Sequence, residues 1–211
     1  MNKDTNSEKI CSVSKYSFKT RFNISRFTYF WKAIDFIACK IKRFALLYEN
    51  TLSKEYEKEG NLFNISDSKK ILHIGCGSYP VTAISLAKYN GGKVVAIDID
   101  PRAIKRAVKV IERKNLQNKI SVDLGDGRNY PLKEFDTIII SSCSIPKIDI
   151  LHHIFKTAKT NSKIIVREIY GASKAVEDCI KLHKNIKIIK RIGNNPFPTS
   201  RWESFYLIKN N

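Results

Sequence analysis

The fold of this chain is decided by the stretch Ile71-Leu72-His73-Ile74-Gly75-Cys76-Gly77-Ser78-Tyr79-Pro80. A short apolar run enters a glycine turn, a helical pattern follows, and a second apolar run ends in the acid Asp98. This order is typical of a nucleoside-binding strand, turn, helix and strand, in which Gly75 and Gly77 let the backbone approach a ligand closely. An acid that ends the second strand can accept both ribose hydroxyls. Asp98 suits that role better than Asp100, which precedes a proline as a helix N-cap would.

The residues after this turn alternate regularly between strand-like and helical patterns. The strand-like runs are Lys70–Ile74, Lys93–Ile99, Ile120–Leu124, Asp136–Ser141 and Lys163–Ile169. The helical runs are Val81–Tyr89, Pro101–Leu116, Ile148–Thr160 and Ser173–Lys184. Such alternation predicts a Rossmann-like α/β domain, in which a parallel sheet is joined by right-handed crossovers.

The C-terminal end breaks this alternation. Two strand-like runs, Ile186–Ile192 and Glu203–Lys209, are separated by a connection that has no room for a helix. We therefore expect the two runs to pair antiparallel and to close a seven-stranded, mostly parallel sheet.

The N-terminal part has a different character. Residues 1–20 are polar and without periodicity, which predicts a flexible tail. From Phe27 to Tyr48 apolar residues recur at the spacing of one helix face, and a polar connection with short helical potential follows at 49–68. We expect residues 21–64 to form a helical cap over the site of a domain at 65–211. A basic amphipathic helix on an anionic membrane is the alternative.

The formal net charge of the chain is +18. The excess of basic residues is shared almost evenly among the first, middle and last thirds of the chain. A nucleic-acid footprint normally clusters on one face. Nucleic acid is therefore an alternative partner, less favoured than a small molecule.

The cysteine pattern and the hydropathy predict where the protein is located and whether it binds a metal. The five cysteines are scattered, and no two of them form a Cys-x-x-Cys pair. We therefore expect free thiols, no bound metal and a cytoplasmic location. No apolar run reaches the roughly eighteen residues of a membrane span, and the N-terminus lacks the apolar core of a signal peptide.

Five parallel strands closed by an antiparallel hairpin, with these motifs after the first two strands, resemble a class I S-adenosylmethionine-dependent methyltransferase. The resemblance covers roughly residues 65–210 and implies S-adenosylmethionine as the cofactor. It further implies that Gly75 and Gly77 cradle the methionine moiety, that Asp98 holds the ribose, and that Asp126 contacts the adenine amine.

The residues that this resemblance assigns to the cofactor are, in chain order, His73, Gly75, Gly77, Ser78, Tyr79, Asp98, Ile99, Asp126, Gly127 and Ser141. Two positions depart from the family. An acid often stands where this chain has His73, and a third small residue stands where it has Tyr79. The amino-acid end of the cofactor is then held differently, by the Ser78 hydroxyl and backbone amides. An NAD site is the poorer reading, because it needs a third glycine where this chain has Pro80.

A narrower resemblance points to nicotianamine synthases, which share this fold but transfer the 3-amino-3-carboxypropyl group instead of methyl. Gly77–Ala87 is similar to their first-strand turn, Leu47–Asn50 to a tyrosine-rich segment that reaches the active site, and Val166–Ala172 to the end of their fifth strand. The N-terminal part is shorter than their helical cap. Methyl transfer to a small molecule is the family default. The alternatives are aminocarboxypropyl transfer to an amine, which gives a metallophore-type product, and RNA methylation.

The chemistry itself asks little of the protein, because the sulfonium of the cofactor is already an activated electrophile. The protein must hold a nucleophile in line with it, and an amine nucleophile must be neutral when it attacks. A tyrosine or carboxylate near the mouth can take its proton, which makes Tyr48 and Glu49 the candidate catalytic residues. The alternative is a core aromatic with a solvated acid beside it. The acceptor, an amine or a carboxylate, and the oligomeric state are left open by the sequence.

Overall fold

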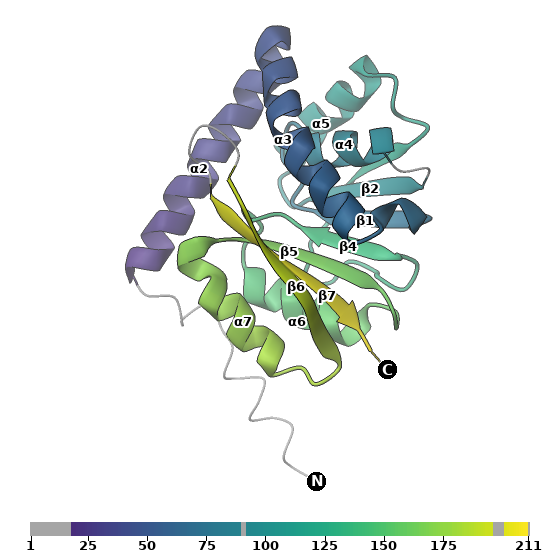
Figure 1. The fold of residues 1–211 in the computed structure, drawn as a ribbon. Helices are drawn as coiled ribbons and strands as arrows, with labels where there is room; N and C mark the ends of the chain where they lie inside the picture. Colours follow the sequence, from purple (N-terminus) through teal and green to yellow (C-terminus); the bar gives the residue numbers. More distant parts are fainter. Residues whose placement is uncertain (1–17, 90–91, 196–200, 211) are drawn as a thin grey trace.

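The computed structural model describes residues 18–89, 92–195 and 201–210. Within these residues, seven strands form one sheet in the order β3-β2-β1-β4-β5-β7-β6 (Figure 1). The strands are β1 (Lys70–Ile74), β2 (Lys93–Asp98), β3 (Ile120–Leu124), β4 (Thr137–Ile140), β5 (Lys163–Ile169), β6 (Ile186–Asn194) and β7 (Trp202–Lys209). The helices are α2 (Phe18–Lys40), α3 (Lys42–Leu62), α4 (Val81–Tyr89), α5 (Pro101–Arg113), α6 (Lys147–Thr157) and α7 (Ser173–Lys181), with short 3-10 turns at η2 (Ile65–Asp67) and η3 (Tyr170–Ala172). This architecture confirms the predicted mostly parallel sheet with an antiparallel C-terminal pair.

The first five strands are parallel, and their register places the buried residues of neighbouring strands side by side. Leu72 of β1 pairs with Val95 of β2 and with Ile138 of β4. All four residues of β4 are buried, which explains why that run is apolar without alternation.

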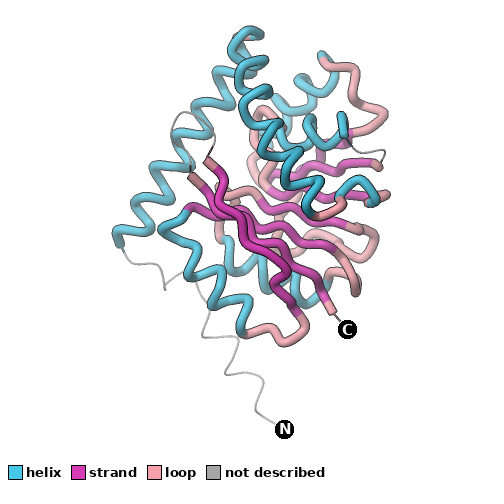
Figure 2. The backbone as a smooth tube through the Cα atoms, viewed as in Figure 1, coloured by secondary structure: helices cyan, strands magenta, loops and turns pink. Residues whose placement is uncertain are grey.

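Two apolar cores cover the two faces of the sheet. Figure 2 shows the helices in separate layers on either side of the strands. One core, which includes Ile71, Ile139 and Ile165, packs against α3, α4 and α5. The other, which includes Leu72 and Ile164, packs against α6 and α7. The sheet is therefore covered on both faces, as expected for a parallel sheet.

The C-terminal strands follow the predicted pairing. β6 and β7 are antiparallel, and β7 lies between β5 and β6. The register shifts between Ile188 and Lys190, where β6 carries an irregularity. The connection at residues 196–200 lies outside the described residues.

The N-terminal helices differ from the sequence prediction in two ways. The apolar stripe from Phe27 to Tyr48 does not lie on one helix, because Ile41 is extended (φ −115°, ψ 104°) and separates α2 from α3. The break lets α3 pack on α4 while α2 lies across the end of the sheet (Figure 1). The predicted polar connection at 49–68 is mostly helix, since α3 continues through Gly60.

That extension of α3 has a physical cause that periodicity of apolar residues does not reveal. Its inward face includes Leu52, but also the buried polar residues Ser53 and Glu59. The charge of Glu59 is satisfied by a partner from a distant strand, so this face looked polar and solvated in the sequence. The tail predicted at 1–20 falls mainly outside the described residues, and residues 18–20 belong to α2. The division into a cap at 21–64 and a domain from 65 stays a prediction.

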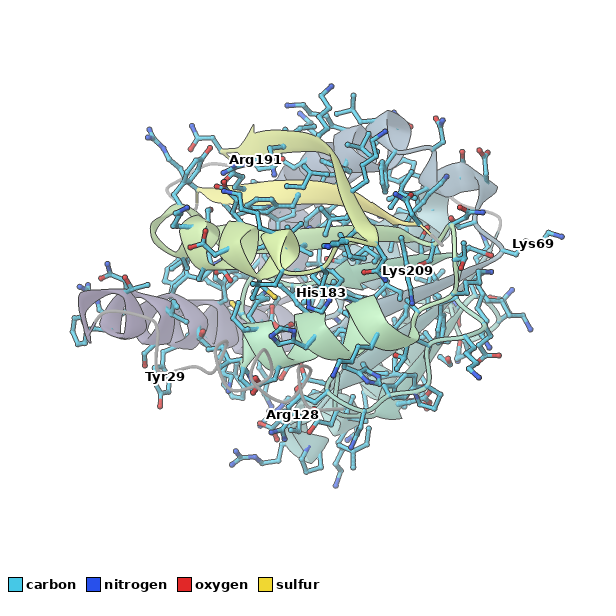
Figure 3. The ribbon with its side chains drawn as sticks, turned by 90° about the horizontal axis from the view of Figure 1, so that it is seen from below. Tyr29, Lys69, Arg128, His183, Arg191 and Lys209 are labelled. Atoms are coloured by element: carbon cyan, nitrogen blue, oxygen red, sulfur yellow. The ribbon has the colours of Figure 1, made fainter. Side chains whose placement is uncertain are left out.

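The surface of the cap carries exposed aromatic and basic side chains. Tyr29 on α2 is 72% exposed, and Figure 3 shows it pointing away from the body of the molecule. None of the described helices is long and apolar enough to cross a membrane.

Candidate functional site

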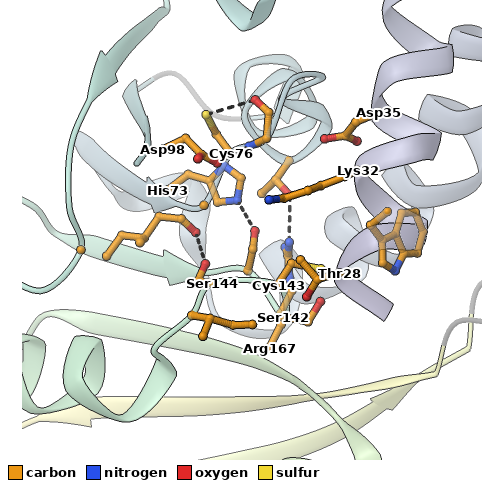
Figure 4. Close-up of a pocket in the computed structure, with 18 of the residues that line it drawn as sticks. Thr28, Lys32, Asp35, His73, Cys76, Asp98, Ser142, Cys143, Ser144 and Arg167 are labelled. Carbon is orange, nitrogen blue, oxygen red and sulfur yellow. Dashed lines mark hydrogen bonds between the residues drawn. The ribbon is translucent and has the colours of Figure 1, made fainter. Parts of the chain in front are cut away.

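A cavity of about 280 Å³ lies at the carboxyl ends of the parallel strands, where α2 crosses them. Its walls come from the loops after β1, β2, β3 and β4, from α2 and α3, and from the ends of β5 and β7 (Figure 4). The sheet order reverses between β1 and β4, and open α/β sheets bind their ligands in the crevice at such a reversal.

The glycine turn after β1 brings backbone directly to the cavity wall. Gly75 and Gly77 both have a left-handed backbone, with φ of +79° and +68°. A Cβ on Gly75 would lie 2.2 Å from Oγ of Ser144, and one on Gly77 would lie 2.2 Å from Oδ2 of Asp35. Both positions therefore favour glycine for conformation, and a Cβ at either would also displace the neighbouring side chain.

Asp100 caps α5 as the sequence predicted, and the carboxylate of Asp98 is fixed at the end of β2. Asp98 accepts hydrogen bonds from the backbone nitrogens of Gly77 (2.9 Å) and Asp100 (3.0 Å), which fix its carboxylate at the end of β2. Asp100 caps α5 by accepting from the backbone nitrogen of Arg102 at 2.9 Å. Ile99 lines the cavity between them and is 58% exposed, which leaves an apolar surface for a flat ring.

Asp126 and Gly127 form the neighbouring wall after β3. Both oxygens of Asp126 accept from Nε of Arg128, and Nη2 of Arg128 lies 2.6 Å from Oδ2. These hydrogen bonds hold the pKa of Asp126 below its usual value, so it is a carboxylate at neutral pH. A Cβ on Gly127 would lie 2.7 Å from Cγ2 of Ile74, so the loop approaches β1 as closely as glycine allows.

His73 lines the cavity as an uncharged side chain. Its Nε2 is 2.8 Å from Oγ of Ser141, and among the described residues its buried Nδ1 has no hydrogen-bond partner. Burial, with a smaller contribution from the charge of Arg167, lowers the pKa of His73 to about 3. The acid that the family often has at this position is thus replaced by a neutral ring.

Two sequence-predicted residues are not brought to the cavity. The side chain of Ser78 does not line it, and Nη1 of Arg106 donates to Oγ of Ser78 at 3.5 Å. Glu49 is buried on another face of α3, where it accepts from the hydroxyl of Tyr79 and pairs with Lys114 at 2.5 Å. Its carboxylate joins α3 to the core and does not face the cavity. The remaining predicted cofactor residues all line the cavity, as does Tyr48.

Tyr48 contacts an acid that the sequence analysis did not single out. Its hydroxyl donates to Oδ1 of Asp35 on α2 at 3.0 Å, and Oδ2 of Asp35 lies 3.5 Å from the backbone nitrogen of Tyr79. Burial raises the pKa of Tyr48 well above its usual value, and Asp35 raises it further. Tyr48 is therefore a neutral hydroxyl at any physiological pH. Asp35 follows Ile34 in the predicted apolar stripe, and no motif marks it.

A buried ion pair closes the cap end of the cavity. Arg167 on β5 donates to Oε2 of Glu59 on α3 at 2.7 Å and 3.0 Å, and to Oγ1 of Thr82 at 2.8 Å. Its guanidinium lies 3.9 Å from the ring centroid of Tyr56, which is next to Trp202. Only the tertiary structure pairs these residues, because Glu59 and Arg167 are 108 positions apart.

The residue after Arg167 takes no part in the cavity. Glu168 is buried and faces Lys147, whose Nζ lies 4.0 Å from Oε2 of Glu168. Lys147 also donates to the backbone carbonyl oxygen of Arg167 at 2.9 Å. Glu168 therefore joins α6 to β5 and does not itself line the cavity.

The residues present fit a nucleoside that carries a positive charge. Two carboxylates, Asp35 and Asp98, face the cavity, and neither has an ion pair among the described residues. Two buried ring nitrogens on its wall, Nδ1 of His73 and Nε1 of Trp31, have no hydrogen-bond partner in the described part of the chain. Hydroxyls and a cation on a ligand would pair with the two carboxylates, since buried polar groups are normally paired.

The sequence of this chain is similar to one family model and to several known proteins. The family model described as a methyltransferase domain matches residues 65–199. The chain is 23% identical over 164 residues to the L-histidine 2-aminobutanoyltransferase of Yersinia pestis, which covers 77% of this chain and 61% of that protein. It is 34% identical over 77 residues to the norajmaline N-methyltransferase of Rauvolfia serpentina, 36% of this chain and 26% of that protein. The chain thus spans about a quarter to three fifths of these relatives.

Solved structures show the same fold. A mutant of MtNAS in complex with S-adenosylmethionine has a TM-score of 0.71 at 18% identity, covering 90% of this chain and 76% of that one. A putative RNA methyltransferase from Pyrococcus horikoshii has a TM-score of 0.62 at 12% identity, covering 76% of this chain and 84% of that one.

Proposed function

This chain belongs to the methyltransferase domain family, and from that premise we propose that it transfers the 3-amino-3-carboxypropyl group of S-adenosylmethionine to an amine. The match over residues 65–199 confirms the predicted class I superfamily, whose cofactor is S-adenosylmethionine. The group transferred and the acceptor are our proposal.

The observation that carries this proposal is the cap. The helices α2 and α3 cross the cavity and place Asp35, Tyr48 and Tyr56 in its wall. The likeness to MtNAS covers 90% of the chain, whereas the likeness to the RNA methyltransferase covers 76%. A cap that closes over the amino-acid end of the cofactor suits an enzyme in which that end reacts. The relative named as an L-histidine 2-aminobutanoyltransferase supports the same chemistry.

In the proposed site, S-adenosylmethionine supplies an activated carbon beside its sulfonium. With the cofactor bound, Asp98 would accept hydrogen bonds from the ribose hydroxyls, Ile99 would offer apolar surface to the adenine ring and Asp126 would accept from the adenine amine. The backbone of the glycine turn would hold the amino-acid part.

The acceptor amine enters beside Tyr48. With its proton donated to Asp35, the Tyr48 hydroxyl oxygen could accept an N–H of the neutral amine and orient its lone pair toward the carbon beside the sulfonium. The new carbon–nitrogen bond would replace the carbon–sulfur bond, methylthioadenosine would leave, and the proton of the amine would pass to solvent at the mouth of the cavity. Lys32 lines the mouth on α2, and its charge suits an acceptor that also carries a carboxylate. An amino acid has both groups.

The test is product analysis. Purified protein is incubated with S-adenosylmethionine and L-histidine or another amino acid, and the products are identified by mass spectrometry. We expect methylthioadenosine and an acceptor enlarged by one aminocarboxypropyl group. An Asp98→Ala variant, which should lose the cofactor, is the control. S-adenosylhomocysteine with a methylated acceptor would overturn the proposal in favour of methyl transfer, the second candidate, which the N-methyltransferase relative favours.

RNA methylation is separated from both by its dependence on salt. Binding to RNA phosphates releases counterions, so its affinity falls steeply as the salt concentration rises. The proposed small-molecule reaction predicts a Michaelis constant for the acceptor that changes little between low and moderate salt.

A further inference from the structure

A carboxylate from the cap lies directly on the glycine turn. Oδ2 of Asp35 is so close to Gly77 that a Cβ there would lie 2.2 Å away, and it is 3.5 Å from the backbone nitrogen of Tyr79. The other oxygen, Oδ1, accepts from the Tyr48 hydroxyl at 3.0 Å. Figure 4 shows Asp35 and Lys32 reaching from α2 toward the turn. Asp35 is thus held from two sides at the amino-acid end of the proposed cofactor site.

The charge of Asp35 is not balanced by the chain. Among the residues that the structure describes, no ion pair joins Asp35 to a basic group, and Lys32, which lines the same cavity, makes none with it. Asp98 lies on the other side of the turn, where Gly77 donates to it at 2.9 Å. Burial raises the pKa of Asp35 to about 7, and the charge of Asp98 adds to this. Of the four aspartates on the cavity wall, Asp100 and Asp126 have arginine partners, whereas Asp35 and Asp98 have none among the described residues, so this end of the cavity favours a cationic group.

The first strand and its turn do not supply this acid. His73 occupies the position where the family often has one, but it is neutral and its Nε2 is bound to Ser141. The Ser78 hydroxyl, which the sequence suggested for the amino-acid end, faces Arg106. Within the described residues, Asp35 is the acid at this end of the turn that has no basic partner.

We infer that Asp35, oriented by Tyr48, forms the subsite that binds the α-ammonium group at the amino-acid end of the cofactor. The inference rests on the proposed S-adenosylmethionine site, but not on which group is transferred. In this chain the acid stands on the cap instead of at the end of the first strand, so a bound cofactor would contact both α2 and the glycine turn. A charge-assisted hydrogen bond between the ammonium and Asp35 relieves the repulsion between the two carboxylates.

Two product-like ligands isolate this contact. S-adenosylhomocysteine carries the ammonium group, and methylthioadenosine lacks the whole amino-acid end. Affinities are measured by isothermal titration calorimetry for the wild type and for Asp35→Asn, which keeps the size of the side chain and an oxygen for Tyr48. We expect Asp35→Asn to weaken S-adenosylhomocysteine roughly tenfold or more, as for loss of a charge-assisted hydrogen bond, and methylthioadenosine less than about twofold.

The matched control is Glu57→Gln, which removes an acid from the same cap outside the cavity. It should change neither affinity. Equal weakening of both ligands by Asp35→Asn would make Asp35 a structural residue of the cap. No change in either would place the ammonium elsewhere. Both results overturn the inference.

A measurement on the wild type covers the case in which Asp35→Asn does not fold. The ionisable groups that interact with Asp35 are Tyr48, Tyr56, Asp98 and the thiols of Cys39, Cys76 and Cys143, and Lys32 lines the same cavity. Burial raises the pKa of Tyr56, so this phenol is also neutral below pH 8. Burial raises the pKa of each of these thiols. Because they and Tyr48 are neutral below pH 8, Asp35 is the group that ionises near pH 7.

We therefore expect the ratio of affinities, S-adenosylhomocysteine over methylthioadenosine, to rise at least about fivefold from pH 6 to pH 8. A flat ratio contradicts the subsite. If the wild type binds neither ligand, the proposed cofactor site fails instead, so the two failures are distinct.

Discussion

The two ends of the cavity are built in different ways. The nucleoside end consists of loops that follow consecutive strands, and its carboxylates are held by backbone nitrogens, as Gly77 and Asp100 hold Asp98. The cap end is assembled from α2, α3, β5 and β7, and its polar groups are held by other side chains, as Glu59 holds Arg167. The first end is specified locally, whereas the second exists only when distant segments meet. Variants at the cap end should therefore lose stability, whereas variants at the nucleoside end should lose affinity for the ligand.

The largest effect is expected from breaking the ion pair at the cap end. Glu59→Gln leaves Arg167 buried without its charge partner, which should lower the free energy of unfolding by about 3–5 kcal/mol. Denaturant unfolding monitored by circular dichroism measures this. The double variant Glu59→Met with Arg167→Met should recover most of the loss, because no unpaired charge remains. A loss below about 1 kcal/mol for the single variant would show that the pair does not hold the cap.

The next largest effect is expected at the nucleoside end, and on binding rather than on folding. Asp98→Ala removes the acceptor of the proposed ribose hydrogen bonds and leaves the Gly77 nitrogen without a partner. We expect the affinities for S-adenosylhomocysteine and methylthioadenosine to fall equally, by roughly 100-fold, since two hydrogen bonds to a charged group are lost. Calorimetry on the same two ligands tests this. A loss confined to one ligand would contradict the assignment.

A smaller effect is expected on how the stability of the protein depends on pH, through Asp35 at the cap end and His73 at the end of β1. The pKa of Asp35 is raised from 3.8 to about 7, so the folded state of the ligand-free protein binds a proton more tightly than the unfolded state does. Its contribution therefore lowers the stability as the pH rises from about 4 to about 7. The lowered pKa of His73 works in the opposite direction between about 3 and 6.5.

Comparison with Asp35→Asn separates the two contributions, because the variant keeps His73. We expect the stability of Asp35→Asn relative to the wild type to increase as the pH rises from 5 to 8, measured by thermal melting without ligand. A constant difference over that range would mean that Asp35 titrates normally.

The smallest effect is expected at Ser78, on the outer side of the glycine turn. Its hydroxyl faces Arg106 and does not line the cavity, so Ser78→Ala should change the affinity for S-adenosylhomocysteine by less than about twofold. Calorimetry at the same pH as the Asp35→Asn measurement checks this. A tenfold loss would restore Ser78 to the amino-acid end of the cofactor and weaken the case for Asp35.

The sequence predicted the sheet with little error because strand and turn signals are local. Lys70–Ile74 and Ile120–Leu124 match β1 and β3 at both ends, and Pro101 begins α5 as a first-turn proline does. Asp98 could be separated from Asp100 for the same reason, since capping is decided by the residues next in the chain. The N-terminal helices were predicted less well. The break at Ile41 lets α2 and α3 pack on different parts of the domain, and no residue type marks it.

By itself, the sequence determined the order of strands and helices along the chain, the glycine turn, and the acids at the end of β2 and after β3, because each depends on backbone conformation or on neighbouring residues. The tertiary structure alone decided which polar side chains meet across the cavity. It turned Ser78 and Glu49 away, buried Glu59 against Arg167, and set Asp35 over Gly77. These contacts join residues far apart in the chain. The charge of a side chain and its position in a helix do not specify its partner, because the partner comes close only when the cap packs on the sheet.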